Sequence, residues 1–130
     1  MHTLARVALV PLIAVFLLAC SQAGPTTPPE GSPEREAIFA AISAGRGQGE
    51  LTFVTSHFLM QGDWAWLTAA PQSKDGTQHY ETESWLLNKA ADGWKVVDQP
   101  CAEEGCDPKQ ELARIRAAHP EAPAGIFPAW

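Results

Sequence analysis

Three side chains that could transfer protons or bind a metal occur at every second position of one segment. They are His79, Glu81 and Glu83. In an extended chain, side chains two residues apart point to the same face, so the histidine and both carboxylates would lie together. Such a group can perform acid-base chemistry or hold a divalent cation. Charged residues at the start of a strand are more often solvated, so we treat the triplet as a candidate binding surface and predict no catalytic residue there.

Two cysteines lie close together in the C-terminal third of the sequence, Cys101 and Cys106. In an oxidising compartment such a pair forms a disulfide, and the small closed loop would stabilise the fold by roughly 2 kcal/mol. The alternative is a metal site that also uses the neighbouring side chains of Glu103, Glu104, Asp107 and His119. Two cysteines without a second pair do not match a zinc signature. We therefore predict the disulfide, and neither a metal nor another cofactor.

Tryptophan is unusually frequent, with five residues in the chain. Trp64 and Trp66 share one face of a predicted strand because they are two residues apart. If this face is exposed, the two rings form a platform for a glycan or a protein partner. If it is buried, they belong to the core, which we favour because a domain of this size needs large apolar side chains. Ala65, Leu67 and Ala69 on the other face can also be buried, so both orientations remain open.

Motifs of known enzyme classes are absent from the sequence. It contains no phosphate-binding glycine loop, no nucleophile elbow and no HExxH segment. The glycine-rich residues 45–49 follow a predicted helix instead of joining a strand to one, which is typical of a flexible connector. We therefore predict a protein without enzymatic activity.

The beginning of the chain has the three parts of an export signal. Residues 1–6 are short and end in Arg6, and residues 7–19 contain no charge. A membrane-spanning helix needs about 20 apolar residues, so this run is short for a permanent anchor. A basic start, a brief apolar middle and a small residue at the end are typical of a signal peptide, here residues 1–19.

The end of this segment, Leu17-Leu18-Ala19-Cys20, resembles the lipobox of bacterial lipoproteins. The resemblance implies cleavage before Cys20 and attachment of a lipid, including palmitate, to its thiol. Several acyl chains on one residue give a lasting membrane anchor. In that family the next residue influences sorting, and Ser21 favours the outer membrane over the inner one. The resemblance thus implies a domain that is anchored to the cell envelope and faces the periplasm.

The chain after this signal is acidic and begins with a segment that has no core-forming residues. It carries eight basic and fifteen acidic residues, a formal net charge of minus seven. Such a charge repels phosphate backbones, so we expect no nucleic-acid partner. Residues 20–31 are rich in proline, threonine and glycine. We expect them to form a flexible tether that reaches roughly 35–40 Å when extended.

Residues 32–130 have the size of a single domain. Ser32-Pro33 begins a predicted helix that Gly45 and Gly47 end. Four strands follow, at residues 51–60, 64–70, 80–89 and 94–98, with tight turns at Gly62 and Gly93 and a polar loop at residues 71–78. A short helix starts at Asp107-Pro108 and stops at His119-Pro120. We also expect three apolar residues of the tail to dock on the body, namely Ile126, Phe127 and Trp130.

This order predicts an α+β fold in which an N-terminal helix packs on a four-stranded antiparallel meander. With the phrases Gly62-Asp63-Trp64-Ala65 and Gly93-Trp94-Lys95-Val96-Val97, it resembles small exported cystatin-like or NTF2-like domains over residues 33–99. That resemblance implies the fold and no particular activity, because such domains serve many functions.

From charge, tether and missing motifs we expect a non-catalytic domain that binds a protein partner, for example as an inhibitor or immunity protein against a basic enzyme. Two alternatives are a structural accessory of an envelope assembly and a small ligand-binding or hydrolytic domain.

Overall fold

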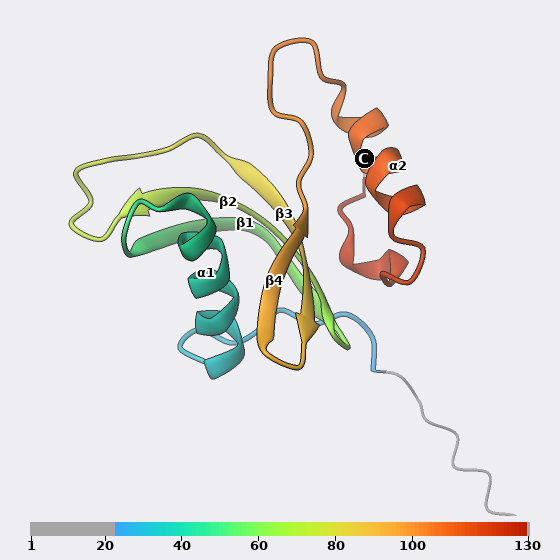
Figure 1. The fold of residues 1–130 in the computed structure, drawn as a ribbon, viewed down its shortest axis with the longest axis horizontal. Helices are drawn as coiled ribbons and strands as arrows, with labels where there is room; N and C mark the ends of the chain where they lie inside the picture. Colours follow the sequence, from blue (N-terminus) through green and yellow to red (C-terminus); the bar gives the residue numbers. More distant parts are fainter. Residues whose placement is uncertain (1–22, 130) are drawn as a thin grey trace, which may run out of the picture.

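The computed structural model describes residues 23–129, and Figure 1 shows their arrangement. The elements in chain order are helix α1 (Pro33–Arg46), strands β1 (Leu51–Gln61), β2 (Trp64–Ser73), β3 (Glu83–Ala90) and β4 (Gly93–Asp98), helix α2 (Pro108–Ala118) and the 3-10 helix η1 (Ala124–Ile126). The strands form one antiparallel sheet with the order β1-β2-β3-β4. The predicted α+β fold, with an N-terminal helix, a four-stranded meander and a short C-terminal helix, is confirmed.

Some predictions fall on residues outside the described range. These are the signal peptide at residues 1–19, the lipid on Cys20, the sorting residue Ser21 and the docking of Trp130. They stay predictions. Within residues 23–129, no helix is both long and apolar enough to cross a membrane.

Helix α1 begins and ends at residues whose chemistry specifies a helix boundary. The Ser32 hydroxyl accepts a hydrogen bond from the Arg35 amide at 3.3 Å, and Pro33 occupies the first turn. Gly47 ends the helix with a φ of 65°, a conformation in which glycine has no steric penalty. Between these ends, Ile38 and Ile42 face the sheet and are fully buried. Local capping and one apolar stripe therefore account for this helix.

The two strand boundaries next to the β2–β3 loop differ from the prediction. β2 continues to Ser73 because it pairs with β1 as far as Leu51. β3 begins at Glu83, so the first residues of the strand predicted at 80–89 lie outside the ladder. The polar loop expected at residues 71–78 therefore starts later, and cross-strand pairing, not residue type, sets its limits.

One face of the sheet packs against α1 and forms the first core. Its buried side chains come from every strand and from the helix: Ile38, Ile42, Phe58, Ala65, Leu67, Ala69, Trp85, Leu87 and Trp94. Phe39 of α1 stacks on Phe53 of β1 with ring centroids 4.7 Å apart. This is the core that the sequence predicts for a helix laid on a meander.

The opposite face of the sheet is partly covered by a second layer. α2 and η1 lie on this side in Figure 1, and the buried side chains between them and the sheet are Trp66, Leu86, Leu112, Ile115, Ala122, Ile126 and Phe127. The predicted docking of the tail is thus confirmed for Ile126 and Phe127, which are 0% and 8% exposed. The sheet therefore separates two small cores, one beneath α1 and one beneath α2 and η1.

The segment before α1 is attached to the domain, which corrects the prediction of a free tether at residues 20–31. Thr26 forms an antiparallel bridge with Met60, with two backbone hydrogen bonds of 2.8 Å. Pro28 is fully buried, and its carbonyl oxygen accepts a hydrogen bond from the buried Arg35 guanidinium at 3.0 Å. Because these contacts fix residues 26–28, only a shorter stretch before them remains as a candidate tether.

Candidate binding site

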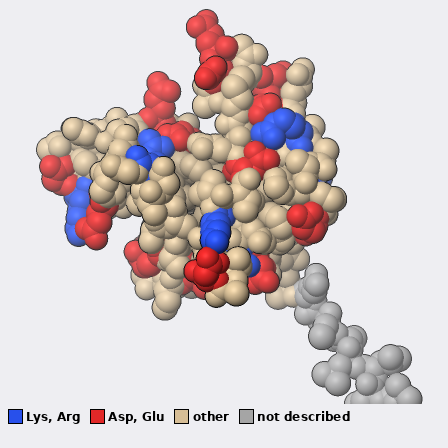
Figure 2. Space-filling view, in the orientation of Figure 1, with Lys and Arg blue, Asp and Glu red and all other residues tan. Residues whose placement is uncertain are grey.

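The disulfide-closed loop at residues 101–106, here called the acidic loop, projects from the body between β4 and α2. It lies at the top of Figure 1, and its tip carries acidic side chains in Figure 2. Cys101 and Cys106 are bonded, with Cα atoms 5.9 Å apart, within the usual range for a disulfide. Glu103 and Glu104 between them are exposed. The predicted disulfide pairing is confirmed, and it presents two carboxylates on a constrained loop.

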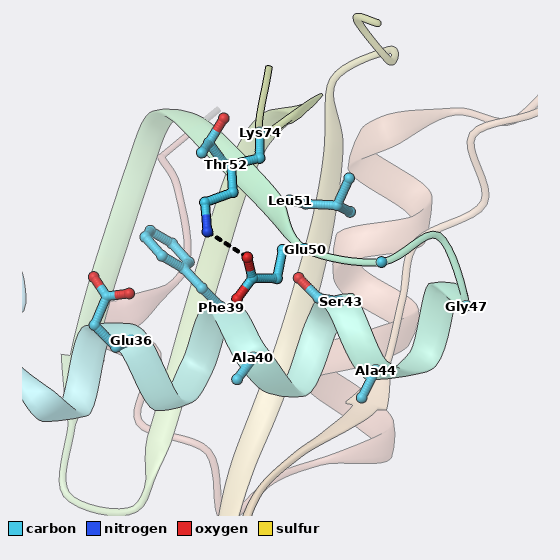
Figure 3. A pocket seen from close by; sticks show the side chains of 11 residues that line it. Glu36, Phe39, Ala40, Ser43, Ala44, Gly47, Glu50, Leu51, Thr52 and Lys74 are labelled. Carbon is cyan, nitrogen blue, oxygen red and sulfur yellow. Dashed lines mark hydrogen bonds and ion pairs between the residues drawn. The ribbon is translucent and has the colours of Figure 1, made fainter. Parts of the chain in front are cut away.

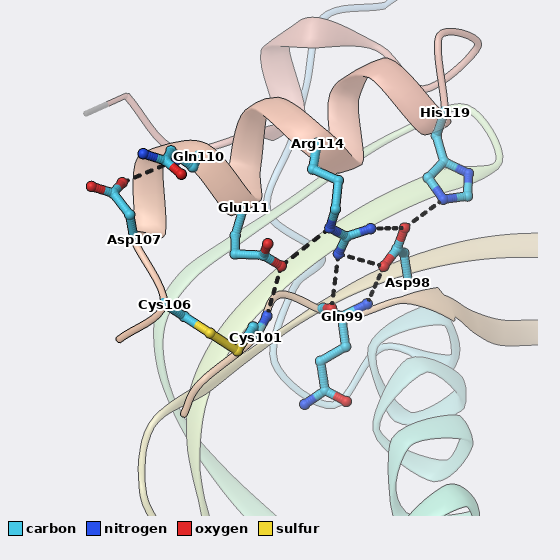
Figure 4. A network of polar contacts seen from close by, with 9 residues as sticks. All are labelled: Asp98, Gln99, Cys101, Cys106, Asp107, Gln110, Glu111, Arg114 and His119. Atoms are coloured by element: carbon cyan, nitrogen blue, oxygen red, sulfur yellow. Dashed lines mark hydrogen bonds and ion pairs between the residues drawn. A yellow bond between two sulfur atoms is a disulfide. The ribbon is translucent and has the colours of Figure 1, made fainter. Parts of the chain in front are cut away.

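A network of polar contacts holds the base of the acidic loop to α2 (Figure 4). The Glu111 carboxylate accepts hydrogen bonds from the Cys101 amide at 2.9 Å and from the Arg114 guanidinium at 3.2 Å. The Cys101 amide, and then Arg114, hold the pKa of Glu111 below its ordinary value. Since Glu111 lies on the helix and Cys101 begins the loop, this carboxylate fixes one end of the loop relative to α2.

The same network continues to the end of β4 through Asp98. Arg114 donates to both carboxylate oxygens of Asp98, at 3.1 and 3.3 Å, and His119 Nε2 lies 2.9 Å from Oδ2. Burial raises the pKa of Asp98, but hydrogen bonds from Arg114, His119 and the Gln99 amide outweigh it, so the pKa is lowered. Asp98 therefore joins the sheet to the middle and the end of α2. These contacts give the pair of His119 and Asp98 a structural role, since they hold α2 to the sheet.

Opening the disulfide should destabilise the domain without removing its fold. We expect Cys101→Ser with Cys106→Ser to lower the free energy of unfolding by about 2 kcal/mol, because a short loop then gains conformational freedom in the unfolded state. Thermal unfolding with and without reductant measures this. The reductant should destabilise the parent protein and leave the double variant unchanged. Equal stability of the two proteins would show that the bond does not constrain the chain.

The histidine and carboxylates predicted as one surface are not brought together. His79 forms an isolated bridge with Gln72 and is exposed, as is Glu81. Glu83 turns towards α1, where it pairs with Arg46 at 2.5 Å and accepts a hydrogen bond from Gln99 at 2.8 Å. Within residues 23–129, no group of three potential metal ligands is assembled. Residues 79–82 lie outside the regular strand, which begins at Glu83, so the alternation expected to align the three side chains does not apply to them.

The two tryptophans share a face, but that face is covered. Trp66 is 2% exposed, and its ring packs on Phe127 with centroids 5.3 Å apart. Its indole nitrogen donates to the Thr68 hydroxyl at 3.1 Å. Trp64 is half-buried, 5.9 Å from the His119 ring. The favoured prediction that the tryptophans belong to the core is therefore confirmed for Trp66, and the alternative of an aromatic platform is wrong for it, because the C-terminal layer covers this face.

A surface groove of about 700 Å³ lies between α1 and the start of β1 (Figure 3). Phe39 and Leu51 contribute apolar surface, with Ala40 and Ala44 of the helix. Glu50 and Lys74 form an exposed ion pair at its edge. In the described part of the chain, every buried side-chain nitrogen or oxygen has a hydrogen-bond partner. Glu50 and Lys74 thus satisfy each other, whereas Glu36, which also lines the groove, is in none of the ion pairs found within residues 23–129.

A smaller cavity of about 180 Å³ lies directly beneath the acidic loop. Trp66, Thr82, Glu83 and Ser84 line it from the sheet side, Gln99 and Pro100 from the segment after β4, Cys101 and Ala102 from the acidic loop, and Pro108 and Leu112 from α2. This arrangement brings together segments that are distant in sequence, which is why no sequence motif marks it. A local signal existed for part of the surrounding network, namely the i,i+3 pair Glu111 and Arg114.

The fold and the site define a class in structural terms: a small α+β domain with a helix on one sheet face, a second layer on the other and an acidic disulfide loop. Comparison with known proteins adds no relative to this description. No family model, no curated protein and no solved structure matches the chain.

Proposed function

We propose that this protein is an envelope-anchored lipoprotein whose non-catalytic domain binds a basic protein partner through the acidic loop. The membrane attachment in this proposal rests on the signal-like residues 1–19 and on the lipobox pattern that ends at Cys20. The domain would face the periplasm, and Ser21 favours the outer membrane. One form of the proposal is an inhibitor or immunity protein that blocks a basic hydrolase.

The observation that carries the binding proposal is the state of the two loop carboxylates. Five basic residues form ion pairs with acids outside the loop, namely Arg46, Lys74, Lys89, Lys95 and Arg114. None of the ion pairs found within residues 23–129 uses Glu103 or Glu104. Their negative charge is therefore available to an incoming cationic surface.

The constraint on the loop supports the same proposal. A segment that is ordered before association loses less conformational entropy when it binds. The disulfide and the Glu111 contact to Cys101 order the acidic loop in advance. An excess of negative charge also accelerates encounter with a basic partner, in a manner that salt weakens. These features suit an inhibitor that presents a preformed acidic surface.

The test is capture of a partner by matched variants. The mature protein, made soluble by Cys20→Ser, is immobilised and exposed to envelope extracts and culture medium. We expect a basic protein that moderate salt releases, and we expect Glu103→Gln with Glu104→Gln to weaken its binding by about tenfold or more. The control is Glu30→Gln with Glu121→Gln, which removes the same charge at exposed positions elsewhere.

Retention of the partner by the control variant and its loss from the loop variant would support the proposed surface. Equal loss from both variants would reduce the effect to net charge alone. Partner binding that changes neither with salt nor with either pair of substitutions would contradict the acidic-loop proposal.

A further inference from the structure

We infer that the cavity beneath the acidic loop receives one basic side chain, an arginine or a lysine, from the protein partner. This inference rests on the proposed function and makes its contact specific. The cavity and the loop share Cys101 and Ala102, so a partner bound at the loop carboxylates lies beside the opening.

The size of the cavity fits a single side chain. Pockets for drug-sized ligands measure about 300–1,000 Å³, and an apolar cavity of about 150 Å³ holds one benzene molecule. The cavity, at about 180 Å³, is therefore of the right size for one inserted side chain and small for a cofactor or an oligosaccharide.

The walls of the cavity match the stem of a long basic side chain. Pro100, Ala102 and Pro108 contribute its accessible apolar surface, and the nearly buried Trp66 and Leu112 lie behind them. Lysine and arginine bury such stems along apolar surfaces while their charged heads stay near polar groups or water. The apolar walls therefore favour the aliphatic part of such a side chain, and its charged group would lie at the opening of the cavity.

The polar groups at the cavity are mainly acceptors or hydroxyls. The Ser84 hydroxyl lies 2.8 Å from the Thr68 hydroxyl, and a hydroxyl has further capacity for hydrogen bonds. The lining includes one acid, Glu83, and no base. Glu83 is already paired with Arg46, whereas the exposed Glu103 and Glu104, which directly follow the lining residue Ala102, are in none of the ion pairs found within residues 23–129. Arg114, which bonds the Gln99 carbonyl at 3.3 Å, is already paired with Asp98 and Glu111, so the unpaired charge of the loop acids favours a cationic head.

The first experiment uses peptides as probes of the cavity. Acetyl-Gly-Arg-Gly-amide is titrated into the isotope-labelled mature protein that carries Cys20→Ser, and NMR shifts are followed. We expect saturable shifts at the Trp66 indole and at the amides of Ser84 and Leu112. The neutral analogue with citrulline in place of arginine and a chitobiose sample should leave these signals unchanged. Saturation by chitobiose instead of the arginine peptide would overturn the inference in favour of a glycan site.

The second experiment fills the cavity. Thr82 is exposed and lines the cavity, so Thr82→Trp should occupy the space without altering the disulfide or the loop acids. We expect it to weaken the arginine peptide by about tenfold, which corresponds to about 1.4 kcal/mol. Thr27→Trp, a matched change at an exposed residue outside the lining, should have no effect. Equal binding by both variants would overturn the inference.

The two proposals fail in different ways. If the captured basic protein binds the Thr82→Trp variant normally but no longer binds the Glu103→Gln, Glu104→Gln variant, the acidic loop is the binding surface and the cavity is not occupied. If the arginine peptide enters the cavity but no basic partner depends on the loop acids, the cavity binds a cationic side chain and the proposed function is wrong.

Discussion

Replacing Trp66 with alanine should lower the free energy of unfolding by about 3–5 kcal/mol, the usual cost of removing a buried tryptophan. Trp66 connects the middle of the sheet to the C-terminal layer, where it packs on Phe127, and its indole nitrogen bonds to Thr68. The substitution would leave a large void between β2 and that layer. Urea unfolding measures the loss, and hydrogen exchange should show that α2 and residues 122–127 lose protection first.

Two further variants separate packing from other effects at this position. Trp66→Phe keeps an aromatic ring but removes the bond to Thr68, and it should cost about 1 kcal/mol plus a small packing loss. Val54 is 57% exposed on β1, so Val54→Ala should change stability by less than about 0.5 kcal/mol. If Trp66→Ala were as mild as Val54→Ala, the C-terminal layer would not be packed on the sheet in solution.

Replacing Asp98 with asparagine should cost about 2–3 kcal/mol at neutral pH, because hydrogen bonds to a charged group are worth more than neutral ones. The Asp98 side chain is 16% exposed and accepts from Arg114, while His119 lies within hydrogen-bond distance. Asparagine keeps the shape but removes the charge and turns an amide donor towards one of these groups. The measurement is urea unfolding of both proteins across a range of pH.

The pH dependence of this effect has a definite sign. The pKa of Asp98 is lowered from 3.8, so the folded protein holds the carboxylate charged where the unfolded chain begins to protonate it. The stabilising contribution is therefore fully present above pH 3.8 and is lost as the pH falls through the lower folded pKa. The stability difference between the parent and Asp98→Asn should therefore be fully present at neutral pH and shrink as the pH falls below 3.8.

A matched control tests whether the network, and not charge alone, causes the effect. Asp92 forms an exposed pair with Lys95 in the β3–β4 turn, with its side chain 67% exposed. Asp92→Asn makes the same chemical change and should alter stability by less than about 0.5 kcal/mol. A difference between the parent and Asp98→Asn that stays constant from neutral pH to well below pH 3.8 would contradict an ionised Asp98 at the centre of the network.

The sequence by itself determined the elements that depend on neighbours along the chain. Ser32 and Pro33 specify the start of α1, Gly62 and Gly93 adopt positive φ values in the two hairpin turns, and Asp107 caps α2 through the amides of residues 109 and 110. Each of these effects acts within four residues, so residue type and spacing are sufficient to predict it. The order of these elements also gives the meander, because short turns join neighbouring antiparallel strands.

The tertiary structure alone decided which sheet face is free and which polar groups meet. Both faces of β2 carry apolar side chains, and only the docking of α2 and η1 shows that Trp66 is covered. Similarly, Asp98 ends β4, whereas Arg114 and His119 belong to α2 and its C-terminal cap, and their contacts with Asp98 depend on how α2 is placed against the end of β4. The prediction that His79, Glu81 and Glu83 share one face of a strand failed for the same reason. Such alternation requires a regular strand, and the β2–β3 pairing begins only at Glu83. Long-range packing sets these contacts, and sequence spacing carries no record of it.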